Sequence, residues 1–365
     1  MPTSLPSLDP LPLPAPSWLL SAFLLLTFFL HVLPMSMALG GGFWAIVAAG
    51  RSRDPAYHEL ARRIAKGLPY WTAAAVTTGV AALLFLQVLY GPVFYASSIV
   101  TARPWLSIVG LVLGGYYGYY FRAHRLEKNP AAALAVGALA WLAFAAVAFL
   151  YVNEMTLMLH PERLLPLYVA NRSGGALGPA DPTFAARYLH MLVASVALSA
   201  LWVAWLGART SGDAGRRVVA LGLEGFAVAA GIQVLLGGWL LAALPGSALR
   251  AFMGAQALAT AALALAVVIT IGAVSVAWRA RPGGSPGRAV VATAGHVLAV
   301  VALMVLMRDV VRRLTLGEAT RSEAMRVAPQ WGMIVLFLVA LLAGAATVAW
   351  MVLATRRPHP ASQGR

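Results

Sequence analysis

Three histidines lie inside long apolar stretches of this sequence: His31, His190 and His296. A polar ring in such a stretch costs free energy unless it is bonded, so each is a candidate functional group. The imidazole ring is a common metal ligand, and the alternative is a hydrogen bond that bridges two helices. The other four histidines fall in expected loops or tails, where a solvated side chain is the ordinary interpretation: His58, His124, His160 and His359.

A histidine and a methionine at similar depth have the chemistry of an axial ligand pair for haem. His190 lies near the start of the apolar run 183–206, and Met253 lies about two residues into the run 251–278. Both runs are expected to enter from the same side. A thioether ligand favours reduced iron and raises the potential. Simple packing is the alternative for Met253, because methionines commonly fill gaps.

Two arginines flank the same level and are candidate partners of haem propionates: Arg187 and Arg250. The sequence has no cysteine, which excludes iron–sulfur ligation and the covalent attachment of a c-type haem. Any haem would therefore be held by side-chain ligands alone.

His31 lies deeper, in a run that continues through Pro34 to three glycines at 40–42. The glycines leave room for a flat ligand or a close helix. His296 is expected to reach a comparable depth. Whether the two rings face each other is left open by the sequence.

Nine apolar runs are long enough to cross a hydrocarbon core of roughly 30 Å. They centre on 18–49, 69–90, 104–121, 131–152, 183–206, 218–243, 251–278, 289–307 and 331–354. The runs are too continuous for barrel strands, and backbone groups in lipid must bond within their own segment. We predict an all-α, polytopic transmembrane bundle of about nine helices.

Composition supports a membrane location, since 61% of the residues are hydrophobic and 11% are charged. The net charge of +15 is spread over loops, which argues against nucleic acid. Basic residues concentrate in alternate loops, so we predict the N-terminus outside and the C-terminus in the cytoplasm. The expected organisation is a flexible external arm over 1–17, a haem-binding bundle over 18–355 and a cytoplasmic tail over 356–365.

Few carboxylates accompany these runs. Glu224 is the only one that we place inside an apolar run, where it either relays a proton or lies near the cytoplasmic end with its carboxylate in solvent. The segment 308–313 is expected just outside the eighth run. Its three arginines are candidates for holding haem propionates or the acidic face of a partner, and a solvated helix end is the alternative.

Several motifs resemble subunit I of cytochrome bd quinol oxidase over most of the chain. The most specific is Asp181-Pro182 followed by Arg187-Tyr188-Leu189-His190, similar to the family's motif around its low-spin haem b histidine. His31 with a following proline resembles the other haem-ligating histidine. Further similar pieces are Thr78-Gly79, Tyr90-Gly91, Arg217 with Gly237, and Arg250 with Met253. The resemblance implies one or two haems b and a bacterial cytoplasmic membrane location.

The sequence also departs from that family. The glutamates that the family carries in its third and eighth helices have no counterpart at the matching places, and His296 stands where an acid would be sought. The long quinol-binding loop is reduced to Pro245-Gly246-Ser247. The spacing from Arg250 to Met253 is one residue longer than in the family, which leaves Phe252 as the alternative occupant of the ligand position.

Three functions follow as hypotheses. The first is a b-type cytochrome subunit of a respiratory chain that passes electrons between the quinone pool and a periplasmic partner, expected to be a separate c-type cytochrome. The second is a terminal quinol oxidase that reduces oxygen, for which a second membrane subunit is expected. The third, from another class, is a haem-free transporter or membrane scaffold. The sequence leaves the quinone site open.

Overall fold

The computed structural model describes residues 12–280, 286–317 and 325–355. Nine helices of 23 or more residues follow one another in this part of the chain: α1 (Ser17–Gly50), α2 (Pro55–Val100), α3 (Ala102–Arg125), α4 (Pro130–Leu157), α6 (Phe184–Ala208), α7 (Gly212–Ala243), α9 (Ala257–Arg279), α10 (Pro286–Leu316) and α11 (Trp331–Thr355). Three short elements complete them: α5 (Pro161–Ala170), α8 (Gly246–Arg250) and the π-helix η1 (Ala251–Ala255). The prediction of an all-α helical bundle is confirmed.

Among the described helices, seven are long and apolar enough to cross a membrane: α1, α2, α4, α6, α7, α9 and α10. Helix α3 runs beside them with a sequence rich in glycine and tyrosine, which lowers its hydropathy. The described apolar stretch of α11 is Trp331–Gly344. The chain is a multi-pass membrane protein.

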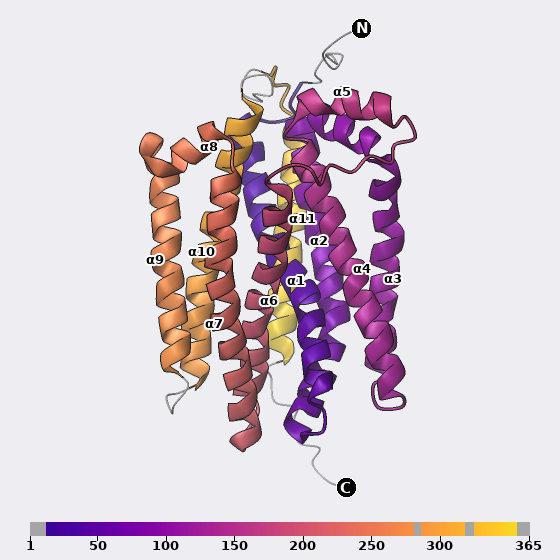
Figure 1. Ribbon diagram of the computed structural model, residues 1–365, viewed down its shortest axis with the longest axis vertical. Coiled ribbons are helices and arrows are strands. Elements are labelled where there is room, and N and C mark those ends of the chain that lie inside the picture. The colour runs from indigo at the N-terminus through magenta and orange to yellow at the C-terminus, as the bar shows by residue number, and fades with distance from the viewer. Residues whose placement is uncertain (1–11, 281–285, 318–324, 356–365) are drawn as a thin grey trace.

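The long helices stand side by side (Figure 1), with α3 and α4 on one flank and α7, α9 and α10 on the other. Helices α1, α2, α6 and α11 lie between the flanks. Helices α5 and α8 lie at one end of the bundle, called here the α5 end, and α1 begins at this end. Which end faces the cytoplasm stays a prediction.

The helices extend beyond the apolar runs that predicted them. The run 69–90 belongs to α2, which begins at Pro55 because Asp54 accepts a hydrogen bond from the Ala56 amide at 2.9 Å and proline suits the first helical position. Helix α2 bends at Tyr90, whose dihedral angles are not helical (φ −129°, ψ 25°). Pro92 explains the bend, since its ring removes an amide donor and clashes with the preceding turn.

Part of the expected N-terminal arm packs on the bundle. Leu13 is buried, its amide donates to the Arg326 carbonyl at 2.8 Å, and its carbonyl accepts from the Ala328 amide at 2.9 Å. Residues 12–16 are therefore held beside the segment that precedes α11. Residues 1–11 of the arm and the expected tail 356–365 lie outside the described residues.

Glycines allow the central helices to approach closely. A Cβ added at Gly40 of α1 would lie 2.0 Å from the Ser195 carbonyl oxygen of α6, and one at Gly222 of α7 would lie 2.4 Å from the Ala204 amide of α6. In a bilayer such contacts supply packing that the hydrophobic effect does not. The α1, α6 and α7 helices therefore form a tightly packed centre.

We predict that Gly40→Ala destabilises the bundle, because the new methyl group meets backbone atoms of α6 that cannot turn away. Overpacking of this kind costs about 1 to 3 kcal/mol. The matched control is Gly231→Ala on α7, where a Cβ meets nothing within 4 Å and the helix gains about 0.5 to 1 kcal/mol. Thermal unfolding in detergent measures both variants, and equal melting temperatures would contradict the close approach.

Candidate functional site

His31 on α1 faces a glycine on α2. Its Nδ1–H donates to the Ala75 carbonyl at 2.9 Å, and a Cβ added at Gly79 would lie 2.7 Å from its Cε1 atom. The hydrogen bond fixes the ring and leaves Nε2 as the nitrogen with a free lone pair. A metal-ligating histidine commonly has this arrangement, in which one ring nitrogen donates to a carbonyl and the other binds the metal.

His190 on α6 faces Gly237 of α7, where an added Cβ would lie 3.6 Å from the His190 Cε1 atom. Its Nδ1 is buried and has no hydrogen-bond partner among the described residues. A buried polar atom without a partner is uncommon in native proteins and calls for an explanation such as a missing ligand. The alternative, a hydrogen bond from the His190 ring that bridges two helices, is not found among the described residues.

His296 on α10 turns to a different neighbour. Its Nδ1–H donates to the Ala292 carbonyl of its own helix at 2.8 Å. A Cβ added at Gly272 of α9 would lie 3.4 Å from both Cδ2 and Nε2 of the ring. His31 therefore faces α2 whereas His296 faces α9, and the structure gives no support for a shared ligand.

Three arginines line one small cavity at the α5 end, together with apolar residues. The lining consists of Met155, Met158, Leu159, Arg187, Arg308, Val311 and Arg312. The Arg308 guanidinium lies 4.5 Å from the centre of the Phe28 ring, and that of Arg312 lies 5.1 Å from the centre of the Tyr90 ring. The prediction that 308–313 lies outside the eighth helix is wrong, because α10 continues to Leu316 and Arg312 is buried within it.

Asp309 accompanies these arginines and is itself buried. Its carboxylate lies 2.8 Å from Arg313 Nη2 and 3.6 Å from Arg312 Nη1. Arg312 Nη1 is nevertheless a buried donor without a hydrogen bond in the described structure. The positive charge around the cavity therefore exceeds the negative charge, which suits an anionic group such as a carboxylate.

Arg187 is held from the loop that precedes α6. Its Nε donates to Thr183 Oγ1 at 2.9 Å, and Thr183 donates through its hydroxyl and amide to Asp181 Oδ1 at 2.6 and 2.9 Å. Asp181 Oδ2 also lies 2.9 Å from His160 Nε2 and 3.2 Å from Arg163 Nη1. The loop residues thus fix the arginine that lies one helical turn from His190.

The same contacts set the charge state of Asp181. Burial by itself raises the pKa of this carboxyl, but the hydrogen bonds from Thr183 and the charges of His160 and Arg163 outweigh burial and hold the pKa below its usual range. Asp181 is therefore ionised at neutral pH and fixes its partners by charge as well as by hydrogen bonds.

The segment with Arg250 and Met253 differs from the expectation. Met253 does not lie inside the seventh long helix, because α9 begins at Ala257 and Met253 belongs to the preceding π-helical turn. The Met253 side chain is 58% exposed, whereas Phe252 is buried and packs with Val311. Arg250 is exposed. The axial role of Met253 and the propionate role of Arg250 stay predictions.

One buried carboxylate was missed in the sequence. Glu154 of α4 is fully buried and accepts hydrogen bonds from three hydroxyl groups of α2. Glu154 follows the predicted run 131–152 by two residues, so it was not placed inside an apolar run. Glu224, the carboxylate that was placed inside a run, is exposed. The sequence did contain one indication of a buried polar partner, which is the group of hydroxyl residues at 97, 98 and 101 that follows an apolar run.

The fold is similar to that of solved structures, among them a bd oxidase from Geobacillus thermodenitrificans. That protein aligns with a TM-score of 0.71 and 15% sequence identity. The alignment covers 95% of this chain and 100% of the other. No protein-family model matches the sequence, and no curated protein matches it. The chain therefore has a bd-oxidase-like fold.

We predict that Asp181→Asn lowers the stability of the protein at pH 7, because it removes an ionised acceptor that holds His160 and Arg163. The loss is about 1 to 2 kcal/mol. A lowered pKa contributes stability above the ordinary value of 3.8, and this contribution disappears as the pH falls through the folded-state value. The difference in melting temperature between the two proteins should therefore shrink in acid.

Asp213→Asn is the matched control, because Asp213 pairs with Arg216 at the exposed start of α7. We expect no change in melting temperature for this variant. A constant difference between wild type and Asp181→Asn from neutral to acid pH would contradict the proposed charge state of Asp181.

Proposed function

We propose that this chain is a haem b-binding membrane subunit, related to bd-type oxidases, that passes electrons between the quinone pool and a periplasmic redox partner. The observation that carries the proposal is His190, a ring inside the bundle whose buried Nδ1 has no partner among the described residues and which faces a glycine. The likeness of the fold to a bd oxidase structure supports the same interpretation.

The residues around His190 and His31 fit the group. His190 supplies a ring nitrogen for iron, and Gly237 keeps the neighbouring helix free of a side chain beside that ring. His31 has its Nδ1 committed to the Ala75 carbonyl and its Nε2 free. The proposed iron ligands are therefore His190 and His31, with Met253 proposed as the second ligand beside His190.

The arginines that line the cavity would bind the propionate groups of haem. Arg187 is on the same helix as His190, three residues before it, so the two side chains share one helix face. Arg308 and Arg312 reach the same cavity from α10. Charge-assisted hydrogen bonds from guanidinium groups to carboxylates are strong and directional, so these residues would orient a haem by its propionates.

Haem b, when bound, supplies a reversible one-electron couple whose potential depends on its ligands and surroundings. The chain's own contribution is to hold that group between helices, to surround it with apolar side chains that exclude water, and to balance the propionate charge with arginines. One or two haems are proposed, since His190 and His31 each offer a ring nitrogen as a ligand. A separate c-type cytochrome, a second membrane subunit and a quinone are proposed partners.

We predict that His190→Ala removes a b-type signal from the reduced-minus-oxidised absorption spectrum of the purified protein. The physical reason is the loss of an axial nitrogen that no other side chain replaces. The wild type purified from haem-sufficient cells should show this signal. A colourless wild type would overturn the proposal and favour a transporter or scaffold, whereas oxygen uptake with quinol would favour a terminal oxidase.

Substitutions of glycine allow a finer test. Gly79→Ala should disturb the haem at His31, because the new methyl group would lie 2.7 Å from the ring and force it to move. Gly231→Ala should leave the spectrum unchanged, since a Cβ added there meets nothing within 4 Å. Haem content per protein and the absorption spectrum are the measurements. Identical haem content and spectra in both variants would argue against His31 as a ligand.

A further inference from the structure

Glu154 has an environment that differs from that of every other carboxylate described above. Its side chain is fully buried near the end of α4. Oxygen Oε1 accepts from Ser97 Oγ at 2.5 Å and from Ser98 Oγ at 3.0 Å, and Oε2 accepts from Thr101 Oγ1 at 2.6 Å. All three partners are neutral hydroxyls, two from the last turn of α2 and one from Thr101, which joins α2 to α3. We call these four residues the Glu154 cluster.

Each of the three hydroxyls has a second acceptor within reach. Ser97 Oγ lies 2.9 Å and Ser98 Oγ lies 2.8 Å from the Phe94 carbonyl oxygen, and Thr101 Oγ1 lies 3.1 Å from the Ser97 carbonyl oxygen. A hydroxyl has one hydrogen and two lone pairs, so it donates to only one of its two acceptors at a time. The direction of the three hydrogens is therefore free to change by rotation about the C–O bonds.

The Glu154 cluster therefore has two hydrogen-bonding arrangements in which every polar group has a partner. When Glu154 is ionised, the hydroxyls of Ser97, Ser98 and Thr101 all donate to its carboxylate. When Glu154 is protonated, its own O–H donates to one hydroxyl, and that hydroxyl donates to its helix carbonyl. No heavy atom has to move between the two states, so neither state leaves a buried donor or acceptor unpaired.

No cation neutralises Glu154 within the described structure. Charged residues on the segments around this end of α4 have other positions or partners: Arg103 of α3 is exposed, Arg163 of α5 pairs with Asp181 and Glu162, Arg187 of α6 bonds to Thr183, Arg308 of α10 lies over the Phe28 ring, and Arg312 of α10 pairs with Asp309. A buried carboxylate without a counter-ion is costly, so proton binding is the ordinary means of neutralising it.

We propose that the Glu154 cluster is a proton-binding site, at which the carboxylate takes up one proton from water and returns it as conditions change. The bond that forms and breaks is a single O–H bond on Glu154, and no electrons are transferred. Ser98 is partly exposed, unlike Ser97 and Thr101, and provides the route by which the proton exchanges with water. The proposal holds whether or not a haem is bound.

The position of the cluster gives the site a role in a redox protein. Met155 of α4 and Met158, the residue that follows α4, line the cavity of the three arginines. A proton taken up beside a group that gains an electron offsets the added charge in a medium of low dielectric constant. This second step rests on the proposed function, whereas proton binding by Glu154 does not.

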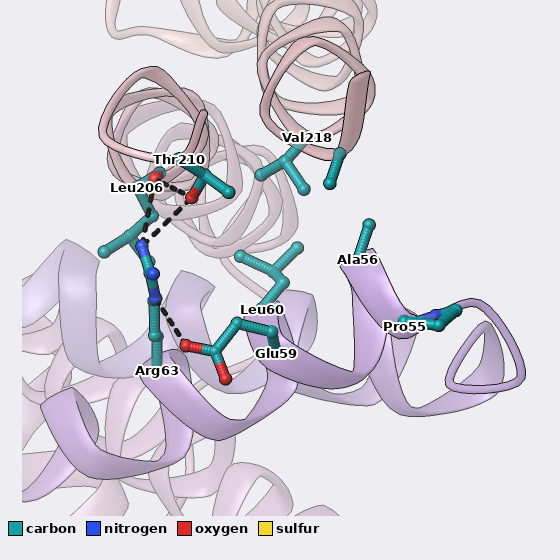
Figure 2. Close-up of a pocket in the computed structure, with 9 residues that line it drawn as sticks. Pro55, Ala56, Glu59, Leu60, Arg63, Leu206, Thr210 and Val218 are labelled. Atoms are coloured by element: carbon teal, nitrogen blue, oxygen red, sulfur yellow. Dashed lines mark hydrogen bonds and ion pairs between the residues drawn. The ribbon is translucent and has the colours of Figure 1, made fainter. Parts of the chain in front are cut away.

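Another cavity offers less. It lies between α2, α6 and α7 at the opposite end of the bundle, lined by residues that include Leu60, Leu206 and Val218 (Figure 2). Its polar rim is already paired, since Arg63 bonds to Glu59, Thr210 and the Leu206 carbonyl. Nothing in its lining selects one class of ligand.

Infrared difference spectroscopy of the purified full chain, recorded between acid and alkaline buffers, tests the proposal. A protonated carboxyl gives a C=O stretching band that moves when H₂O is replaced by D₂O. Exposed carboxyls also protonate in acid, so the informative signal is the part of the C=O absorption that the wild type shows and Glu154→Gln lacks. We expect this part to be present in the wild type, lost in Glu154→Gln and retained in the control Glu224→Gln. Equal C=O absorption changes in the wild type and in Glu154→Gln would overturn the proposal.

Thr101→Val keeps the carboxyl and protects the test against misfolding of the glutamine variant. Loss of one hydroxyl weakens the hydrogen bonding of Glu154, so the C=O band should shift to higher frequency while remaining dependent on pH. An unshifted band would show that the titrating carboxyl is elsewhere. A reduced-minus-oxidised infrared spectrum then examines the redox coupling separately: its failure would remove the coupling and leave proton binding intact.

Discussion

A hydrocarbon environment offers no hydrogen-bond partners, and this constraint explains most of the molecule. Backbone groups must bond within their own segment, so the long apolar stretches form helices from end to end. Side chains with polar atoms must find partners inside the bundle or at its ends. His31 bonds to a carbonyl of the adjacent helix, His296 to one of its own, and His190 has a ring nitrogen that the described chain leaves without a partner.

Glycine lies opposite each of these rings. Gly79, Gly237 and Gly272 are on the helices that face His31, His190 and His296, respectively. An added Cβ would clash with the ring at Gly79, whereas at Gly237 and Gly272 it would lie 3.6 and 3.4 Å from the ring. Three histidine–glycine pairs on three different helix contacts give the bundle several places where a flat ligand or a close helix contact is accommodated. This geometry, together with the bd-oxidase-like fold, is the basis of the haem proposal.

Several charged groups gather inside the bundle at the α5 end. Asp181 holds His160, Arg163 and, through Thr183, the side chain of Arg187. Arg308 and Arg312 reach the same region from α10. Glu154 lies nearby with hydroxyl partners alone. The cavity is thus lined by arginines, whereas Glu154 has hydroxyl partners alone, an arrangement suited to an anionic group at the first and a proton at the second.

Much of the fold was determined by the sequence, because hydropathy acts locally. Nine apolar runs correspond to the nine long helices, and the three intramembrane histidines were identifiable from their surroundings in the chain. The residues at which helices begin and end were harder to predict from the sequence. The run 69–90 became a helix from Pro55 to Val100, and 308–313 proved to be part of α10, since a polar residue continues a helix whenever tertiary partners satisfy it.

Only the tertiary structure decided which residues far apart in the sequence contact one another. The sequence indicated that Gly79 and Gly237 matter but not that each faces a histidine, and it gave no sign that His31 and His296 turn to different helices. The Glu154 cluster joins residues about fifty positions apart, and the arginine cavity joins α6 to α10. The physical reason is that the helical period fixes which residues share one face, whereas the rotation and neighbour of each helix depend on packing with all the others.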